Sequence, residues 1–274
     1  MPNRWKVRVA IIDTGVDLFH PTLRDCVSKY YSWIGAPTNA DDTDGHGTYC
    51  AYFLSQVAPE AEVHVAKVFS GKDFSETEAQ NIAKAIRHAV DDWKVDILSM
   101  SFGLPKPSPK TEHDIKEAIK HAAINNVLMF AAASNEGVGH PRTFPSTIRS
   151  VICIHASDGM GVNGDINPYH EQGDHNFMTL GIAIKSPKFR QPGDAYKSGT
   201  SFATPVAAGI AANLLEIAPN EKSRKTLRDP EDMRKMFALM SERVGKYAHV
   251  APSLLRRQDD NHHFLEERGL GRCT

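Results

Sequence analysis

Residues 199–217 read Gly-Thr-Ser-Phe-Ala-Thr-Pro-Val-Ala-Ala-Gly-Ile-Ala-Ala-Asn-Leu-Leu-Glu-Ile, and the rest of the chain is organised around this stretch. From Phe202 onward the apolar residues recur at steps of three and four, which is the spacing of one face of a helix. Ser201 therefore lies at the start of a buried helix. A serine there commonly caps free N–H groups of the helix. It can instead present its hydroxyl outward, beside amides and a helix dipole that favour negative charge.

Apolar segments typical of strands alternate with helical patterns along the chain. Strands are expected at residues 5–12, 61–69, 95–103, 127–133, 150–155 and 178–184, and helices at residues 46–57, 76–93 and 111–126. The second of these helices begins with a capping box, Ser75-Glu76-Thr77-Glu78. Repeated strand-helix-strand units predict an α/β fold of three layers, with a mostly parallel twisted sheet and helices on both faces.

The composition gives no sign of a nucleic-acid or membrane partner. The 274 residues carry a formal net charge of -1, so no electrostatic attraction to nucleic acid or to an anionic membrane is expected. No apolar run approaches the roughly 20 residues of a membrane span, and the first residues lack the apolar core of a signal peptide. We therefore expect an intracellular protein with neither partner.

The cysteines and acidic residues predict no metal site. Cys26, Cys50, Cys153 and Cys273 lie far apart without C-x-x-C spacing, so free thiols are expected rather than a zinc site or a disulfide framework. An acidic loop around Gly45 is similar to a calcium loop, but the EF-hand pattern would place alanines at its first and twelfth positions. We expect no cofactor; calcium is left open, without an identifiable site.

The pattern changes after Pro219. Residues 221–229 are strongly charged, residues 230–244 have helical spacing, and residues 258–274 are polar. We expect one domain over residues 1–219 and a charged, helical extension over residues 220–274 that ends in a disordered tail.

Three polar residues stand where chemistry is expected in such a fold. Asp13 directly follows the first strand, and His46 and Ser201 each open a helix. Each residue has an ordinary structural interpretation, as a turn aspartate, a surface or core histidine and a helix cap. Together they fit acyl transfer, because a serine becomes nucleophilic when an imidazole accepts its proton and a carboxylate orients that imidazole. Asn135, after another apolar strand, can donate to the oxyanion beside the backbone N–H of Ser201.

Three segments resemble the catalytic signatures of the subtilases, the subtilisin-like serine peptidases, and occur in that family's order. They are Asp13-Thr14-Gly15, Gly45-His46-Gly47-Thr48-Tyr49-Cys50-Ala51 and Gly199-Thr200-Ser201-Phe202-Ala203-Thr204-Pro205. The resemblance runs from about Val7 to Pro219. It implies that Asp13 orients His46, and that His46 is the general base and acid for the nucleophile Ser201. It also implies an oxyanion hole made by Asn135 and the backbone of Ser201.

The resemblance also implies where a polypeptide substrate binds. Ser101, Phe102 and Gly103 would pair with its backbone as an added strand. Ala131, Ala132 and Ala133, together with Gly103, would form the walls of the pocket for the side chain before the scissile bond. Cys50 resembles the free cysteine that one branch of the family has near the catalytic histidine, so bulky thiol reagents are expected to inhibit.

Two features depart from the family or leave a choice open. Ser134 stands before Asn135 where the family usually has glycine, so it is expected to add backbone strain of about 1 kcal/mol or less. Asp41, Asp42 and Asp44 form either a solvated acidic loop or a surface that favours basic residues next to the cleavage site.

The predicted function is serine endopeptidase activity through an acyl-enzyme intermediate. The alternative is a weak or inactive pseudopeptidase that binds extended peptides. An esterase is disfavoured, because the G-x-S-x-G elbow of α/β-hydrolases and its residue order are missing. The chain also resembles stand-alone subtilase modules of larger intracellular proteins, so other domains of such a protein are expected as partners.

Overall fold

The computed structural model describes residues 5–71, 75–104 and 106–252. Cys273 and the polar segment 258–274 lie outside the described residues. The strands are β1 (Arg8–Asp13), β2 (Val27–Ser32), β3 (Glu62–Lys67), β4 (Ile97–Met100), β5 (Leu128–Ala132), β6 (Ile152–Ser157), β7 (Phe177–Leu180), β8 (Ile184–Pro187), β9 (Asp194–Lys197), β10 (Ser241–Val244) and β11 (Tyr247–Val250). The helices are α1 (Pro21–Cys26), α2 (His46–Val57), α3 (Glu76–Asp91), α4 (Pro109–Ile124), α5 (Thr200–Ile217), α6 (Glu221–Leu227) and α7 (Pro230–Leu239).

Nine of the described strands form one twisted sheet, in the order β10-β11-β7-β6-β5-β4-β1-β3-β2. The pairs between β11 and β2 are parallel, and β10 pairs with β11 in the antiparallel sense. Parallel strands bring their carboxyl ends to one edge of a sheet, where ligands of open α/β folds bind. The ends of β1, β4 and β5 therefore place Asp13, Ser101 and Ser134 along the same edge.

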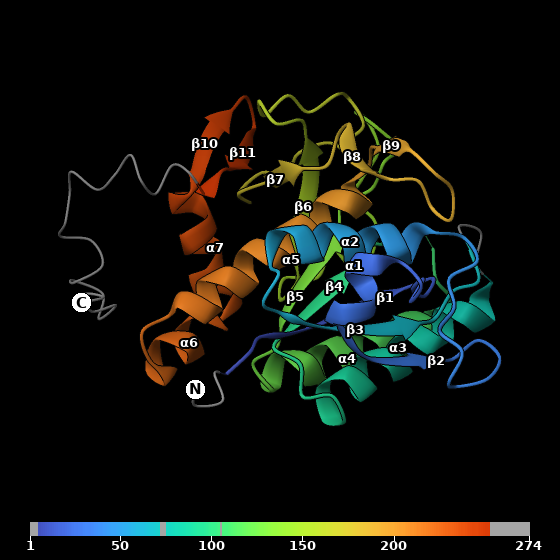
Figure 1. Cartoon of the computed structure of the whole chain (residues 1–274). Coiled ribbons are helices and arrows are strands. Elements are labelled where there is room, and N and C mark those ends of the chain that lie inside the picture. The colour runs from blue at the N-terminus through green and yellow to red at the C-terminus, as the bar shows by residue number, and fades with distance from the viewer. Residues whose placement is uncertain (1–4, 72–74, 105, 253–274) are drawn as a thin grey trace.

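Helices cover both faces of the sheet, which confirms the expected three-layer α/β fold (Figure 1). The two faces alternate along β1. Val9 and Ile11 pack in the cluster that contains α2 and α5, whereas Ala10 and Ile12 pack in the cluster that contains α3 and α4. This burial on both sides explains why the sequence of β1 is a continuous apolar run.

The helix starts follow the expected capping chemistry with one correction. At α3 the Ser75 hydroxyl accepts from the backbone N–H of Glu78 at 3.2 Å, and the Glu78 side chain accepts from the N–H of Ser75 at 2.8 Å. At α4, which begins before the expected residue 111, the Ser108 hydroxyl is the cap and accepts from the backbone N–H of Thr111 at 3.2 Å. Gly199 is the N-cap residue of α5 and Ser201 lies inside the first turn, so Ser201 does not cap the helix.

The C-terminal part contributes to the same core. Met233 and Phe237 of α7 are fully buried, and the Phe237 ring stacks 5.8 Å from that of Phe130 on β5. The charged stretch beginning at residue 220 includes α6 and leads to α7, so the core continues past the boundary expected at residue 219. The helix expected over residues 230–244 ends at Leu239, and residues 241–250 form the hairpin β10-β11.

Two further segments differ from the expectation. Residues 21–32, where no helix or strand was expected, form α1 and the edge strand β2. The single strand expected over residues 178–184 is divided between β7 and β8, and β8 continues into a separate antiparallel hairpin with β9. Within the described ranges, no helix is both long and apolar enough to cross a membrane.

Candidate active site

The acid and the histidine predicted from the sequence are in direct contact. His46 Nδ1 lies 2.7 Å from Asp13 Oδ1, and the same carboxylate oxygen accepts from the backbone N–H of Thr14 at 2.8 Å. Asp13 is buried, whereas a quarter of the His46 side chain is exposed. Because Asp13 occupies Nδ1, the other ring nitrogen, Nε2, is the one that can exchange a proton with a nucleophile.

Two glycines allow β1 and α2 to approach closely enough for this contact. A Cβ on Gly47 would lie 2.3 Å from the carbonyl oxygen of Gly15, and a Cβ on Gly15 would lie 2.4 Å from that of Ala40. Gly15 also has a φ of +115°, which other residues rarely adopt. The glycines that flank the acid and the histidine in the sequence are therefore required by close backbone packing.

Asp42 organises the loop that precedes His46. Its carboxylate is fully buried and accepts five hydrogen bonds, from Thr14 Oγ1, the backbone N–H groups of Asp44, Gly45 and Thr48, and Thr48 Oγ1. Asp41 forms an ion pair with Arg190, and only Asp44 of the three acids is exposed. The Asp44 carboxylate accepts from the backbone N–H of His46 at 3.2 Å. The acidic segment is therefore not a uniformly solvated loop, and all three of its carboxylates have partners.

The charge of Asp13 controls the titration of His46. Burial favours the neutral imidazole, but the Asp13 carboxylate outweighs burial, and the pKa of His46 lies well above its ordinary value. Burial also raises the pKa of the Cys50 thiol, so Cys50 is neutral at neutral pH. We therefore assign the raised pKa of His46 to Asp13 rather than to a thiolate at Cys50.

Cys50 lies between the histidine and the serine. Its Sγ is 3.9 Å from His46 Nδ1, and the thiol donates to the backbone carbonyl of Ser201 at 3.5 Å. The His46 ring also lies 5.4 Å from the ring of Phe202, the neighbour of Ser201. Among the described residues, no hydrogen bond joins the Ser201 hydroxyl to the His46 ring. Such bonds are often long in enzymes without substrate.

Asn135 is held against the first turn of α5. Its Oδ1 accepts from the backbone N–H of Thr200 at 2.8 Å, which leaves the Nδ2 hydrogens free to donate elsewhere. The Thr200 hydroxyl donates to the Ser134 carbonyl at 3.2 Å. Ser134 has a φ of +145°, so its backbone is strained for a residue with a Cβ, as expected from the sequence.

The residues predicted to bind substrate end two neighbouring strands. Ser101, Phe102 and Gly103 follow β4 beyond Met100, its last paired residue, and Gly103 is half-buried. Ala131 and Ala132 are in β5, and Ala133 follows it; all three are buried. The two segments therefore run side by side at the sheet edge that carries Asp13 and Asn135.

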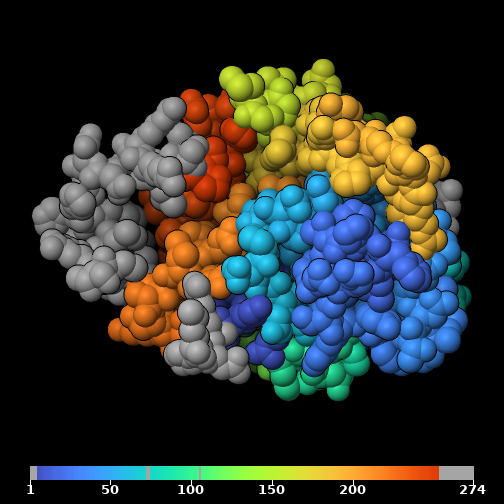
Figure 2. Space-filling view, in the orientation of Figure 1, coloured from blue at the N-terminus to red at the C-terminus, as the bar shows by residue number. Residues whose placement is uncertain are grey.

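The hairpin β8-β9 contributes contacts that the sequence did not predict. Its Arg190 forms ion pairs with Asp17 and Asp41. The N–H of Phe189 donates to the Tyr49 hydroxyl at 2.9 Å, and the Phe189 ring packs where a Cβ of Gly45 would lie. Figure 2 shows the gold surface of this segment against the blue surface of the N-terminal loops. A lone arginine in a polar loop carries no signal that would reveal these partners.

One group of side chains among the described residues has the spacing of a metal site. The ligand atoms of Asp13, His46 and Cys50 lie within 4.8 Å of one another. A thiophilic metal could use this set. A metal bound there would replace the contact between His46 Nδ1 and Asp13. Metal binding at this group would therefore inhibit catalysis rather than support it.

Comparison with known proteins identifies the family. Residues 5–237 match the profile of the subtilase family. The chain belongs to this family. It is 33% identical over 264 residues to the subtilisin-like protease het-Q2 of Podospora anserina, covering 80% of this chain and 72% of that protein. It is 31% identical over 260 residues to the major intracellular serine protease of Bacillus subtilis, covering 84% and 76%.

The fold of this subtilase also matches solved structures. The protease domain of PatA superimposes with a TM-score of 0.74 at 23% identity, covering 94% of this chain and 98% of that domain. The nisin leader peptidase NisP from Lactococcus lactis gives 0.74 at 19% identity, covering 92% and 87%. The family and its relatives together identify the chain as a serine endopeptidase that acts on polypeptides.

Proposed function

We propose that Asp13, His46 and Ser201 form the catalytic triad of this endopeptidase. The observation that carries the proposal is the 2.7 Å contact between Asp13 Oδ1 and His46 Nδ1. This contact fixes the proton on Nδ1 and leaves Nε2 unprotonated in the neutral imidazole. Ser201, next to Phe202 and bound to Cys50 through its carbonyl, belongs to the same cluster.

The reaction follows from these positions. The Ser201 Oγ attacks the carbonyl carbon of the substrate while its proton passes to His46 Nε2. The carbonyl electron pair moves to oxygen, and the amine then leaves with the proton from His46. Water, deprotonated by His46, then attacks the carbonyl carbon of the acyl-enzyme. The tetrahedral intermediate that forms breaks its bond to Ser201 Oγ, which takes the proton back from His46, and the carboxylic acid product is released.

The oxyanion is stabilised by Asn135 Nδ2 and the backbone N–H of Ser201. Thr200 orients the Asn135 amide, because the backbone N–H of Thr200 donates a hydrogen bond to the amide oxygen of Asn135. Ser201 is the second residue of α5, where backbone N–H groups have no partner within the helix. Removing one such donor lowers turnover by roughly 100- to 1,000-fold, a loss measured for the oxyanion-hole asparagine of a subtilisin and carried over here.

The substrate lies along Ser101, Phe102 and Gly103 as an added strand. These residues follow the last paired position of β4, so their backbone groups are not committed to the ladder with β5. The side chain before the scissile bond enters the space between Gly103 and Ala131, Ala132 and Ala133.

We also propose that the enzyme needs no cofactor and works inside the cell, within or beside other domains of a larger protein. The 32% identity to the intracellular serine protease of Paenibacillus polymyxa supports this location.

The test is covalent labelling with a fluorophosphonate probe. The native chain should be labelled, Ser201→Ala should not, and His46→Ala should be labelled far more slowly. A peptide substrate should be cleaved by the native chain alone. Binding of peptides without labelling in any variant would instead identify a pseudopeptidase. The strained Ser134 favours this alternative.

A further inference from the structure

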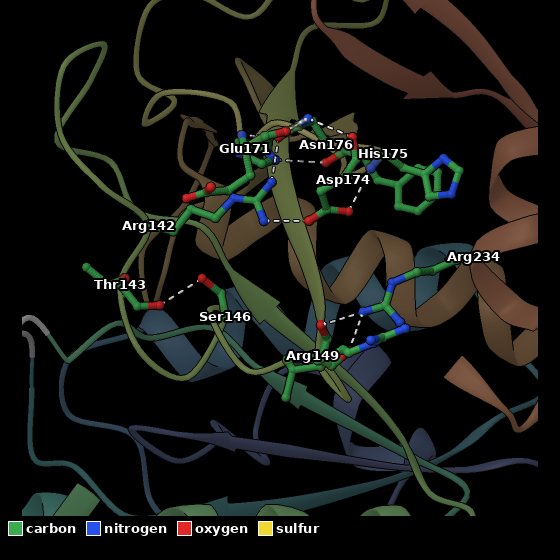
Figure 3. Close-up of polar contacts among 12 residues, drawn as sticks. Arg142, Thr143, Ser146, Arg149, Glu171, Asp174, His175, Asn176 and Arg234 are labelled. Carbon is green, nitrogen blue, oxygen red and sulfur yellow. Dashed lines mark hydrogen bonds and ion pairs between the residues drawn. The ribbon is translucent and has the colours of Figure 1, made fainter. Parts of the chain in front are cut away.

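A buried arginine joins the loop between β5 and β6 to the loop that precedes β7 (Figure 3). Arg142 lies in the segment between β5 and β6, and its side chain is 4% exposed. Its Nη1 donates to Asp174 Oδ2 at 2.6 Å, and its Nη2 donates to Asn176 Oδ1 at 2.5 Å. The catalytic steps described above use none of these groups.

The loop that receives Arg142 is fixed by its own hydrogen bonds. Asn176 Oδ1 also accepts from the N–H of Glu171, and Asn176 Nδ2 donates to the carbonyls of Glu171 and Asp174. Although burial favours its neutral form, the hydrogen bond and charge of Arg142 lower the pKa of Asp174. At neutral pH the guanidinium is therefore anchored to a charged, internally bonded loop at the start of β7.

The next residue, Thr143, touches both walls of the proposed pocket. Its N–H donates to the Ala133 carbonyl at 2.9 Å, and its hydroxyl donates to the same carbonyl at 3.3 Å. On the other side, Thr143 Oγ1 lies 2.1 Å from where a Cβ of Gly103 would stand. A side chain in contact with both segments closes the gap between them at that end.

We propose that Arg142 is a positioning residue that holds Thr143 across the end of the pocket, so that the enzyme selects small side chains before the scissile bond. This inference rests on the substrate site proposed above. The guanidinium suits the task because its planar fork reaches Asp174 and Asn176 together. A lysine ammonium keeps the charge but lacks this fork, so it leaves Thr143 less firmly placed.

Peptide binding to the Ser201→Ala chain tests the inference without requiring catalysis. Two peptides that differ only by alanine or phenylalanine before the scissile bond are titrated, and the ratio of their Kd values is the readout. The unmodified pocket should favour alanine. Thr143→Ala should shift the ratio toward phenylalanine by about tenfold or more, the scale set by hydrophobic pocket contacts. Arg142→Lys should shift it in the same direction, and should add nothing in the Thr143→Ala background.

Arg234→Lys is the matched control. Arg234 donates to the carbonyls of Arg149 at 2.8 Å and Val151 at 2.9 Å, so it ties the far end of the same segment to α7 (Figure 3). It should lower thermal stability and leave the Kd ratio unchanged. The inference is overturned by an unchanged ratio in Thr143→Ala, by equal shifts in Arg142→Lys and Arg234→Lys, or by failure of the alanine peptide to bind the unmodified pocket. Fluorophosphonate labelling of the native chain tests the triad assignment in a separate experiment. A failure of that assignment can therefore be distinguished from a failure of the inference about Arg142 and Thr143.

Discussion

The Asp13 carboxylate binds the His46 imidazole through one oxygen only. Oδ1 receives both His46 Nδ1 and the N–H of Thr14, while Oδ2 is buried and has no hydrogen-bond partner among the described residues. The full negative charge is thus held beside the ring in a place where water does not reach it. This arrangement favours the imidazolium, which is the form that the histidine takes in the transition state.

The pH dependence of peptide hydrolysis should reflect this charge. The neutral imidazole is the base, so kcat/KM should rise with pH, with a midpoint above the ordinary histidine pKa of about 6.5. In Asp13→Asn the midpoint should fall and kcat should drop by roughly 10⁴, the loss known for the equivalent change in another serine protease. A midpoint that stays the same in Asp13→Asn would show that Asp13 does not set the pKa.

The hydrogen bonds that the Asp42 carboxylate accepts should make a large contribution to the free energy of unfolding. Asp42→Asn replaces one acceptor oxygen with a donor that faces other donors, so unfolding should become easier by about 3 kcal/mol. Thermal and urea denaturation provide the measurement. Asp44→Asn is the control, since Asp44 is exposed, and it should change stability by less than about 0.5 kcal/mol. Equal effects of the two substitutions would contradict the conclusion that the buried Asp42 carboxylate holds this loop together.

Relief of strain at residue 134 should stabilise the chain. Ser134→Gly keeps the +145° φ without the penalty of a Cβ and should raise the free energy of unfolding by about 1 kcal/mol. Ser134→Ala removes the hydroxyl but keeps the Cβ, so it should give no such gain. If alanine stabilises as much as glycine, the backbone at this position is not strained.

Bulky thiol reagents should inhibit slowly through Cys50. The thiol is buried and its pKa is raised by burial, so reaction should be slow, yet a mercurial there would separate His46 from Ser201. Activity should fall in step with modification of Cys50, and Cys50→Ala should be resistant. Burial also raises the pKa of Cys153 to about 11, so this thiol should react only after unfolding. Full activity after complete modification of Cys50 would refute the expectation.

Acid should destabilise the fold through its buried histidines. Burial lowers the pKa of His155 to about 3 and that of His64 to about 4. Both pKa values lie below the unfolded value of about 6.5, so the stabilisation is complete above pH 6.5 and is lost as the pH falls toward 3. For His155 the loss is on the order of 3–5 kcal/mol.

His155→Asn separates this effect from general acid denaturation. An asparagine amide can donate to the Phe177 carbonyl as His155 Nδ1 does, but it does not titrate. The free energy of unfolding, measured with urea between pH 7 and pH 4, should depend less on pH in this variant. An unchanged slope would mean that His155 takes no part.

The sequence was sufficient for the elements whose pattern is local. The apolar runs of β1 and β5, the capping box at Ser75 and the start of α2 at His46 are dictated by residues close in the chain, and the structure has them as predicted. The strain at Ser134 was also predictable from the resemblance, because the family usually has glycine at this position, and the observed φ of +145° is one that glycine tolerates.

Contacts between distant segments could not be read in this way. β10 and β11 have no strong alternation, and β11 is a strand because it pairs with β7 and completes the sheet. The partners of Arg142 and Arg190 lie 32 to 173 residues away in the chain, so the sequence gives each arginine the pattern of an ordinary surface charge. Asp42 is similar, since its burial depends on Thr14 and Thr48 closing around it.

The ion pairs of Arg190 with Asp17 and Asp41, here called the clamp, have a consequence for the synthesis of the chain on the ribosome. Its partner Asp41 leaves the ribosome 149 residues earlier, together with the loop that leads into His46. A nascent chain that ends before β8 therefore contains the base but neither the clamp nor the nucleophile. If Ser201 is the nucleophile proposed above, peptidase activity arises only after this residue has been made, so a nascent chain that ends before it does not cleave itself.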